Sequence, residues 1–206
     1  MNKATWYAMA LLMGTLLSPI TAANGLDTQD QARALDAASS VPWPAAARVK
    51  PNHVLGVQTL SIELGESKKN RSARIAHVYQ YNHVIEQSRM VSIDLVADTV
   101  LDQQTIDSLH LPLSNNEINH AIALLAKAET LLERMRHEQR NRGVTAFNTL
   151  DELEVKASIF SPMDADHICV TNRCALLSLF DSTNTVFTLE PIAILSTGVV
   201  TTLKRH

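Results

Sequence analysis

The stretch that decides the fold runs from Ser114 to Met135 and reads SNNEINHAIALLAKAETLLERM. Ser114 and Glu117 have the spacing of a capping box, in which two side chains satisfy the free backbone N–H groups at a helix start. Apolar residues then recur every three or four positions, at Ile118, Ala121, Ile122, Leu125, Ala128, Leu132 and Met135. This is the pattern of a helix with one buried face. We therefore expect one long helix that Gly143 ends.

Alternating apolar residues follow this helix and predict a sheet. Leu153 to Phe160 is the first expected strand, with Val155, Ala157 and Ile159 on one face, and Cys174 to Asp181 is the second. Three shorter strands are expected at residues 185–189, 192–195 and 199–203, with turns at 182–184 and 197–198. Pro191 indicates an edge or a bulge in this sheet.

The first half of the chain repeats this order. Asp27 or Thr28 can cap a short helix over residues 29–38, and the prolines after it predict a linker over residues 41–52. Strands are expected at 54–64, 73–81 and 91–96, and Asp98 marks a turn. Residues 74–79 match 173–178, and residues 91–95 match 192–195, about a hundred positions apart, as in a duplicated domain. A helix packed on an antiparallel sheet in each half is an α+β arrangement.

The N-terminus has the three parts of a signal peptide. Met1 to Lys3 is positively charged, Ala4 to Leu17 is apolar, and Ser18 to Ala23 offers a cleavage site with small residues. The alternative is an uncleaved membrane anchor, but the stretch is short for a bilayer span and Pro19 ends it. We predict that residues 1–23 are a signal peptide and that the protein is exported, either to the periplasm or as a secreted protein. No later segment is apolar for long enough to predict stable membrane insertion after cleavage.

Cys169 and Cys174 are the two cysteines. In an oxidising compartment such a close pair is most simply a disulfide. Two free thiols, or a metal site with His167 as third ligand, are the alternatives. We predict the disulfide and no metal site.

Composition limits the remaining functions. Hydrophobic residues make up 46% and charged residues 19% of the chain, which is typical of a globular protein. The net charge is −3, and no basic run resembles a nucleic-acid-binding patch, so no nucleic-acid partner is expected.

Several polar groups are weaker candidates for a site. His77 and His83 bracket a strand and turn and could converge, and Asp164, Asp166 and His167 could bind a cation or form a solvated loop. Asp94 and Glu154 lie in expected strands and could supply a buried carboxylate, or point to solvent. The cluster Arg134, Arg136, Arg140 and Arg142 could bind an anion or be a solvated helix end. No catalytic or cofactor motif is present, so we predict no catalytic residue and no cofactor.

Three segments resemble a known family. His110 to Ile118, HLPLSNNEI, is similar to the beginning of the small N-terminal domains of copper amine oxidases. Residues 173–200 resemble the end of those domains, with Leu179-Phe180-Asp181, Thr183-Asn184 and Thr197-Gly198 at the matching places, and Val91 to Leu95 fits one of their strands. The resemblance covers most of residues 53–203. It implies two cystatin-like units, which we place at residues 24–108 and 109–206.

The resemblance does not extend to the catalytic residues of that family. Those enzymes need a tyrosine that follows an asparagine, and three copper-binding histidines, two of them as His-x-His. No tyrosine here follows an asparagine, and no His-x-His occurs. We therefore expect a non-catalytic exported accessory module that binds a protein, either a second copy as a homodimer or a partner such as a secreted oxidase. The alternative is a periplasmic protein that binds a small ligand, either an amine or a metal.

Overall fold

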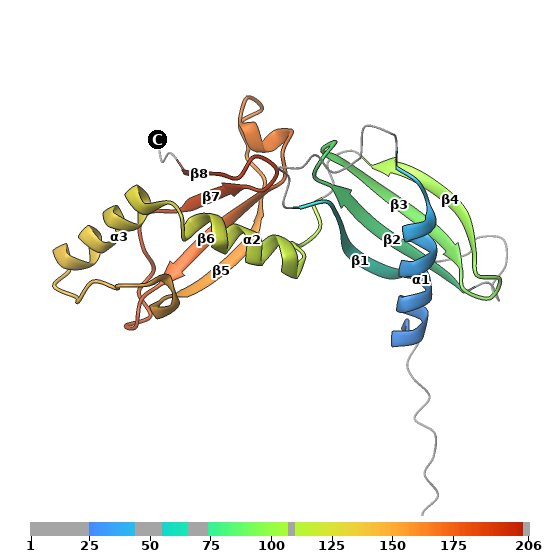
Figure 1. Ribbon diagram of the computed structural model, residues 1–206, viewed down its shortest axis with the longest axis horizontal. Helices are drawn as coiled ribbons and strands as arrows, with labels where there is room; N and C mark the ends of the chain where they lie inside the picture. Colours follow the sequence, from blue (N-terminus) through green and yellow to red (C-terminus); the bar gives the residue numbers. More distant parts are fainter. Residues whose placement is uncertain (1–24, 44–54, 66–73, 107–109, 204–206) are drawn as a thin grey trace, which may run out of the picture.

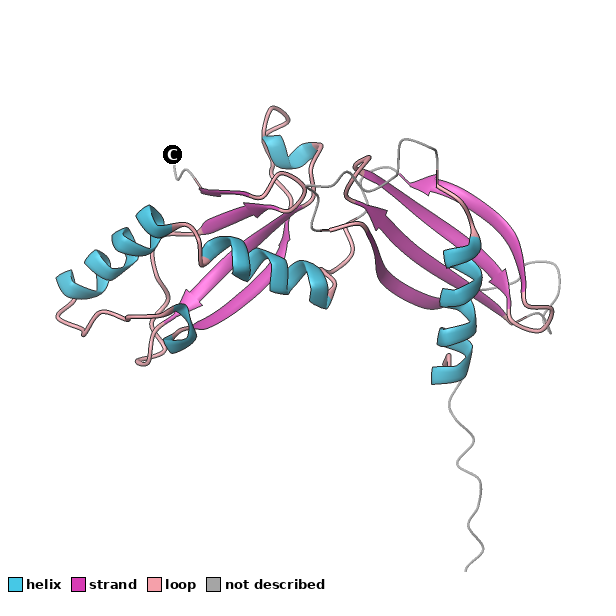
Figure 2. Ribbon diagram, viewed as in Figure 1, coloured by secondary structure: helices cyan, strands magenta, loops and turns pink. Residues whose placement is uncertain are grey.

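The computed structural model describes residues 25–43, 55–65, 74–106 and 110–203. Two four-stranded antiparallel sheets follow one another, in the orders β1-β2-β3-β4 and β5-β6-β7-β8. A helix lies on one face of each sheet (Figures 1 and 2). The predicted α+β class is confirmed, and the arrangement is consistent with two cystatin-like units. The predicted signal peptide, and residues 44–52 of the predicted linker, lie outside the described residues.

The first unit consists of α1 (Thr28–Ser40), β1 (Val57–Gly65), β2 (Ile75–Asn82), β3 (Gln87–Asp94) and β4 (Thr99–Ile106). Helix α1 begins where the sequence indicated, because the Asp27 side chain accepts a hydrogen bond from the Asp30 N–H at 2.7 Å. Its small residues Ala34 and Ala38 lie against β2 and β3 in a core that includes Val78 and Ile93. Small residues on α1 let the helix approach the sheet closely.

The expectation of three strands in the first half is wrong, because β4 adds a fourth. Every residue of β4 except Ile106 is exposed. The strand therefore lacks the alternation of apolar and polar residues that marks a half-buried strand. Its position is fixed instead by the turn before it, where Asp98 has a φ of 50°, and by pairing with β3.

The second unit consists of α2 (Asn115–Leu125), α3 (Glu129–Asn141), β5 (Glu154–Phe160), β6 (Cys174–Phe180), β7 (Pro191–Ile194) and β8 (Val199–Thr202). Two short 3₁₀ helices, η2 (Leu150–Glu152) and η3 (Ile168–Val170), lie in its loops. Helix α2 covers one face of the sheet, and its buried Leu125 joins Leu177, Leu179 and Leu195 in the larger core of the protein.

The predicted single helix is two helices. Both termini form as expected, since Ser114 and Glu117 make the reciprocal capping box, and Gly143 follows α3 with a φ of 73°. The helix breaks at Ala128, whose φ and ψ of −86° and 61° are not helical. Apolar spacing continues through the break, since Leu132 and Met135 of α3 still enter the core. The spacing therefore could not reveal the break.

The prediction of a strand at residues 185–189 is also wrong. Val186 makes a single bridge to Phe180, while Phe187 turns into the core and Thr188 bonds to Glu138 of α3 through its backbone N–H and hydroxyl. Pro191 is neither in an edge strand nor at a β-bulge. It is the first residue of β7, which lies between β6 and β8, a place where a missing N–H is tolerated.

Backbone contacts support the predicted duplication. The Leu95 N–H donates to the Arg74 carbonyl at 2.9 Å, and the Leu195 N–H donates to the Arg173 carbonyl at 3.1 Å. These pairs belong to the two segments that match in sequence, so equivalent strands meet in the same way in both units. The predicted boundary at residue 108 falls outside the described residues and stays a prediction.

Candidate functional site

A buried carboxylate joins the two units. The turn between β2 and β3 carries His83 to the N-terminus of α2, where its Nε2 lies 2.9 Å from Oε1 of Glu117. Both side chains are fully buried. Arg173, which directly precedes β6, donates from Nε to the same oxygen at 2.6 Å. One residue of the first unit and two of the second therefore form a single polar cluster.

The environment keeps Glu117 ionised. Burial by itself would raise the pKa of this carboxyl, but hydrogen bonds from His83 and Arg173 outweigh burial and lower its pKa to about 2. An ionised carboxylate only accepts hydrogen bonds. His83 must therefore carry a proton on Nε2, and its Nδ1 is buried without a hydrogen-bond partner.

Arg173 also fixes the chain that leads into α2. Its Nη2 donates to the carbonyl oxygens of Leu111 and Pro112 at 3.0 and 2.8 Å. Its guanidinium lies 5.7 Å from the centre of the Tyr81 ring, a distance that allows a cation–π contact. The Nη1 atom is buried and has no hydrogen-bond partner. Arg173 thus ties the helix start, the carboxylate and the first unit together.

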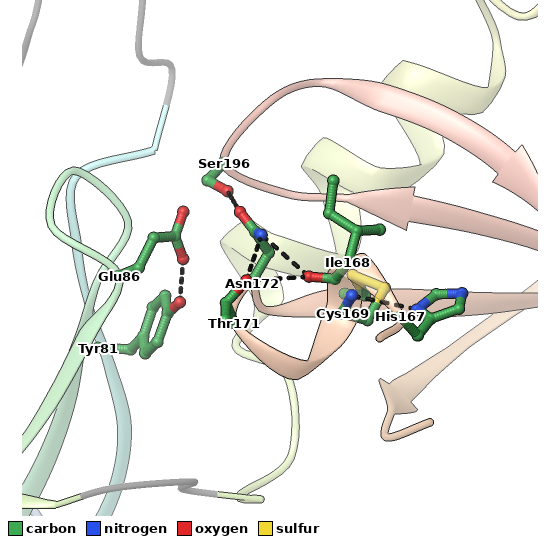
Figure 3. The surroundings of a disulfide bond; sticks show 9 residues. Tyr81, Glu86, His167, Ile168, Cys169, Thr171, Asn172 and Ser196 are labelled. Atoms are coloured by element: carbon green, nitrogen blue, oxygen red, sulfur yellow. Dashed lines mark hydrogen bonds between the residues drawn. A yellow bond between two sulfur atoms is a disulfide. The ribbon is translucent and has the colours of Figure 1, made fainter. Parts of the chain in front are cut away.

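A cleft of about 230 Å³ opens beside this cluster, at the junction of the units. Tyr81, Glu86 and Ser88 line it from the first unit, and Phe160 and Asn172 line it from the second. Figure 3 shows Tyr81 and Glu86 on one side, facing Thr171 and Asn172 on the other. Because both units supply its walls, the cleft depends on their arrangement.

Tyr81 and Glu86 form the acidic part of the cleft. The Tyr81 hydroxyl donates to Oε2 of Glu86. Burial, and then this carboxylate, raise the pKa of the Tyr81 phenol far above its usual range, so it stays protonated. Glu86 has a φ of 51°. The left-handed region is uncommon for residues other than glycine, asparagine and aspartate.

A disulfide shapes the opposite wall, since Cys169 and Cys174 are bonded. The predicted disulfide is confirmed, and the alternatives of free thiols or a metal site with His167 are wrong. His167 instead accepts a hydrogen bond at Nδ1 from the Cys169 N–H at 3.1 Å. Asn172 donates to the Ile168 carbonyl and accepts from the Ser196 hydroxyl (Figure 3). The bridge and these bonds hold residues 169–174 against β6.

The two carboxylates proposed for a buried site do not form one. Asp94 accepts hydrogen bonds from the N–H groups of Val96 and Ala97 and so stabilises a turn. Glu154 is exposed and pairs with Lys156 on the same strand.

The two histidines expected to converge make separate contacts. His77 bonds through Nδ1 to the Ser92 hydroxyl at 2.9 Å, on the face of the first sheet away from α1. His83 bonds to Glu117 of the second unit.

The other polar candidates are solvated or paired. Asp164 and Asp166 lie in an exposed loop, where Asp164 accepts from the Asp166 N–H. Within the described ranges, no group of three or more histidine, cysteine or acidic side chains is arranged to hold a metal ion. Three of the clustered arginines are engaged by acids: Arg136 and Arg140 pair with Glu133, and Arg142 pairs with Asp181. An anion site there would have to displace these carboxylates.

Sequence reasoning missed the cluster at the junction. It identified Glu117 only as part of a capping box, and it expected His83 to converge with His77 rather than with Glu117. The available signal was the match of residues 173–178 with 74–79, which places an arginine before an equivalent strand in each half.

None of the helices in the described ranges is both long and apolar enough to cross a membrane.

Comparison with known proteins supports the fold of this chain but does not assign the chain to a family. No family model matches the sequence, and no curated protein matches it. Among solved structures, a copper-containing benzylamine oxidase from Hansenula polymorpha is similar, with a TM-score of 0.52 and 10% sequence identity. The similarity covers 86% of this chain and 29% of that enzyme. It supports the fold that the resemblance to amine oxidase N-terminal domains implied. At this identity it shows the fold alone.

Proposed function

We propose that this chain is an exported, non-catalytic accessory module that binds a partner protein. The observation that carries this proposal is the loop beside the disulfide. Met163 is fully exposed there, and Ile168 and Val170 are 48% and 52% exposed. Exposed apolar side chains grouped on one loop are typical of protein-binding sites.

The loop is held in place before any partner binds. Cys169 lies between Ile168 and Val170 in the 3₁₀ helix η3 and is bonded to β6 through Cys174. The Asn172 amide donates to the Ile168 carbonyl at 2.9 Å. A preorganised loop loses less conformational entropy on binding than a flexible one does. Ile168 and Val170 are thus presented on a fixed backbone.

Export is part of the same proposal. The predicted signal peptide over residues 1–23 supports it, and so does the disulfide, because such bonds persist mainly in oxidising compartments. The partner is a second copy of the chain or a secreted oxidase. The fold similarity to part of a copper-containing oxidase is the reason for naming an oxidase as a possible partner.

The test is cross-linking in intact producing cells or their medium, with mass spectrometry of the linked peptides and light scattering of the purified protein. The double variant Met163→Ser and Ile168→Ser should weaken the complex at least about tenfold. The control is Val96→Ser with Val199→Ser, which removes exposed apolar side chains elsewhere. A complex that survives the first variant as well as the second would refute this surface. A protein that stays monomeric and forms no cross-links would refute the function.

A second candidate function is the binding of a small ligand. This includes the amine or metal ligand that the sequence analysis gave as the alternative. It is favoured by the cleft at the junction, whose walls bring polar side chains from both units together. Thermal unfolding with added amines, metal salts and neutral solutes tests it. A midpoint unchanged by every class would count against it.

A further inference from the structure

The size and the polar groups of the cleft at the junction restrict the class of ligand that it can bind. This inference rests on the second candidate function. Its volume of about 230 Å³ is below the usual 300–1,000 Å³ of sites for drug-sized molecules. The cleft therefore suits one small ring or a short chain. Apolar side chains of Ile106, Ile159 and Phe160 form part of the wall, so the ligand must also offer some carbon surface.

Several polar side chains in the wall have at least one polar atom without a hydrogen-bond partner within the described part of the chain. The Gln87 amide and the Ser88 hydroxyl make no side-chain hydrogen bond there, and both line the cleft. Glu86 uses Oε2 for Tyr81, which leaves Oε1 free to accept. Arg173 lines the cleft and has a guanidinium nitrogen, Nη1, that is buried without a hydrogen-bond partner. These groups include donors and acceptors.

The backbone at Glu86 points to the same place. Glu86, Asp98 and Asn184 are the three non-glycine residues with positive φ in the described ranges. Aspartate and asparagine adopt this conformation readily, whereas glutamate does not. Strained backbone is often retained where it positions a functional group. Here it places the carboxylate of Glu86 at the cleft, against Tyr81.

The free hydrogen-bond donors and acceptors in the cleft wall indicate which class of ligand fits. An ammonium ion only donates hydrogen bonds and a carboxylate only accepts them, so either would leave part of the wall unsatisfied. A hydroxyl group does both. Arg173 is the one arginine or lysine in the wall of the cleft as far as the structure describes it, and its charge is already balanced by Glu117 at 2.6 Å. Glu86 can accept strongly from a hydroxyl, because hydrogen bonds to charged acceptors are the stronger ones.

We infer that the junction cleft binds a small neutral polyhydroxylated ligand, of the size of one monosaccharide ring. Its hydroxyls bond to Glu86, Gln87 and Ser88, and its carbon face lies on Phe160. The site requires both units, since Phe160 belongs to the second.

The test uses the full mature chain labelled with ¹⁵N and titrated with D-glucose, D-mannose and D-galactose, and separately with butylammonium and acetate. At least one sugar should shift the amide signals of residues 86–88 and 171–173. The double variant Gln87→Leu and Ser88→Ala should raise its Kd at least about tenfold. The matched control, Gln103→Leu and Ser158→Ala, changes the same residue types at exposed strand positions that do not line the cleft and should leave Kd unchanged.

Each of the following results would overturn the inference. If butylammonium shifts these signals and the sugars do not, the ligand is a cation, so the inference fails and the second candidate function stands. If sugars bind equally to the cleft variant and its control, the site lies elsewhere. If no probe shifts these signals, the inference and the second candidate function both fail.

Discussion

Arg74 and Arg173 occupy the same position in the two units. Each directly precedes the second strand of its sheet and pairs with the acid at the third position of the unit's main helix. Arg74 lies 2.5 Å from Asp30, and Arg173 lies 2.6 Å from Glu117. The duplication therefore includes a clamp between the sheet and the helix start.

The two clamps differ in their exposure to water. The Arg74 side chain is 45% exposed and that of Asp30 is 8% exposed, whereas Arg173 and Glu117 are buried by the docking of His83. The equivalent ion pair is thus partly exposed, on the arginine side, in one unit and fully buried in the other.

Removing the two arginines should have unequal effects. Arg173→Ala leaves Glu117 charged and buried with His83 as its remaining side-chain partner, which costs about 3–5 kcal/mol in comparable cases. Arg74→Ala should cost at most about 1 kcal/mol, because the Arg74 side chain is 45% exposed and Asp30 keeps Arg33 as a partner at 2.7 Å. Urea unfolding of both variants measures the difference in the free energy of unfolding. Equal losses would show that the buried position of Arg173 has no energetic consequence.

Acid should weaken the junction through Glu117. Its pKa is about 2 in the folded protein, below the ordinary value of 4.5. The stabilisation is therefore complete above about pH 5 and is lost as the pH falls towards 2. The shift corresponds to roughly 3 kcal/mol. Urea midpoints measured between pH 6 and 2.5 should fall steeply for the wild type. Glu117→Gln lowers the midpoint at neutral pH but should flatten this dependence, and an unchanged slope would assign it to other carboxylates.

Local signals made much of the second unit predictable. The capping box at Ser114 and Glu117 and the glycine at 143 are satisfied within one helical turn, so tertiary context cannot easily overrule them. Strands β5 and β6 carry an alternating apolar face that the core requires. The disulfide followed from the short spacing of its cysteines.

The features that the sequence did not predict lack such a local signal. Strand β4 has almost no buried side chain, so backbone pairing alone defines it. The contact of His83 with Glu117 joins residues from different units, and no local pattern encodes it. The fold was therefore predictable where one element carries its own pattern. The candidate site was not, because it forms only when two units meet.

Gly65 should not tolerate a side chain. A Cβ at this position would clash with Nε2 of His77, whose ring is fixed by its hydrogen bond to Ser92. Gly65→Ala should cost about 1–3 kcal/mol, the usual range for overpacking. Thermal unfolding of Gly65→Ala in the wild type and in a His77→Ala background measures it. If the clash is the cause, the His77→Ala background removes most of the penalty. A penalty that persists there would indicate a backbone effect at Gly65 instead.

Processing of the N-terminus provides an independent prediction. If residues 1–23 are a signal peptide, intact mass spectrometry of the exported protein should find Asn24 as the first residue. Thr21→Arg with Ala23→Arg should block cleavage, because the site needs small residues. A mature protein that keeps Met1 to Ala23 would favour the uncleaved anchor.

The disulfide should stabilise the cleft wall more than the whole protein. The bridge closes a loop of only six residues from Cys169 to Cys174, for which chain entropy gives about 2 kcal/mol. Cys169→Ala with Cys174→Ala should lower the free energy of unfolding by about that amount and speed amide hydrogen exchange at residues 168–173. Exchange in β2 and β3 should not change, because the core of the first unit does not contact the bridge. Reduction of the wild type is the matched control and should reproduce the local effect. Unchanged exchange at residues 168–173 would mean that the hydrogen bonds of Asn172 hold the loop without the bridge.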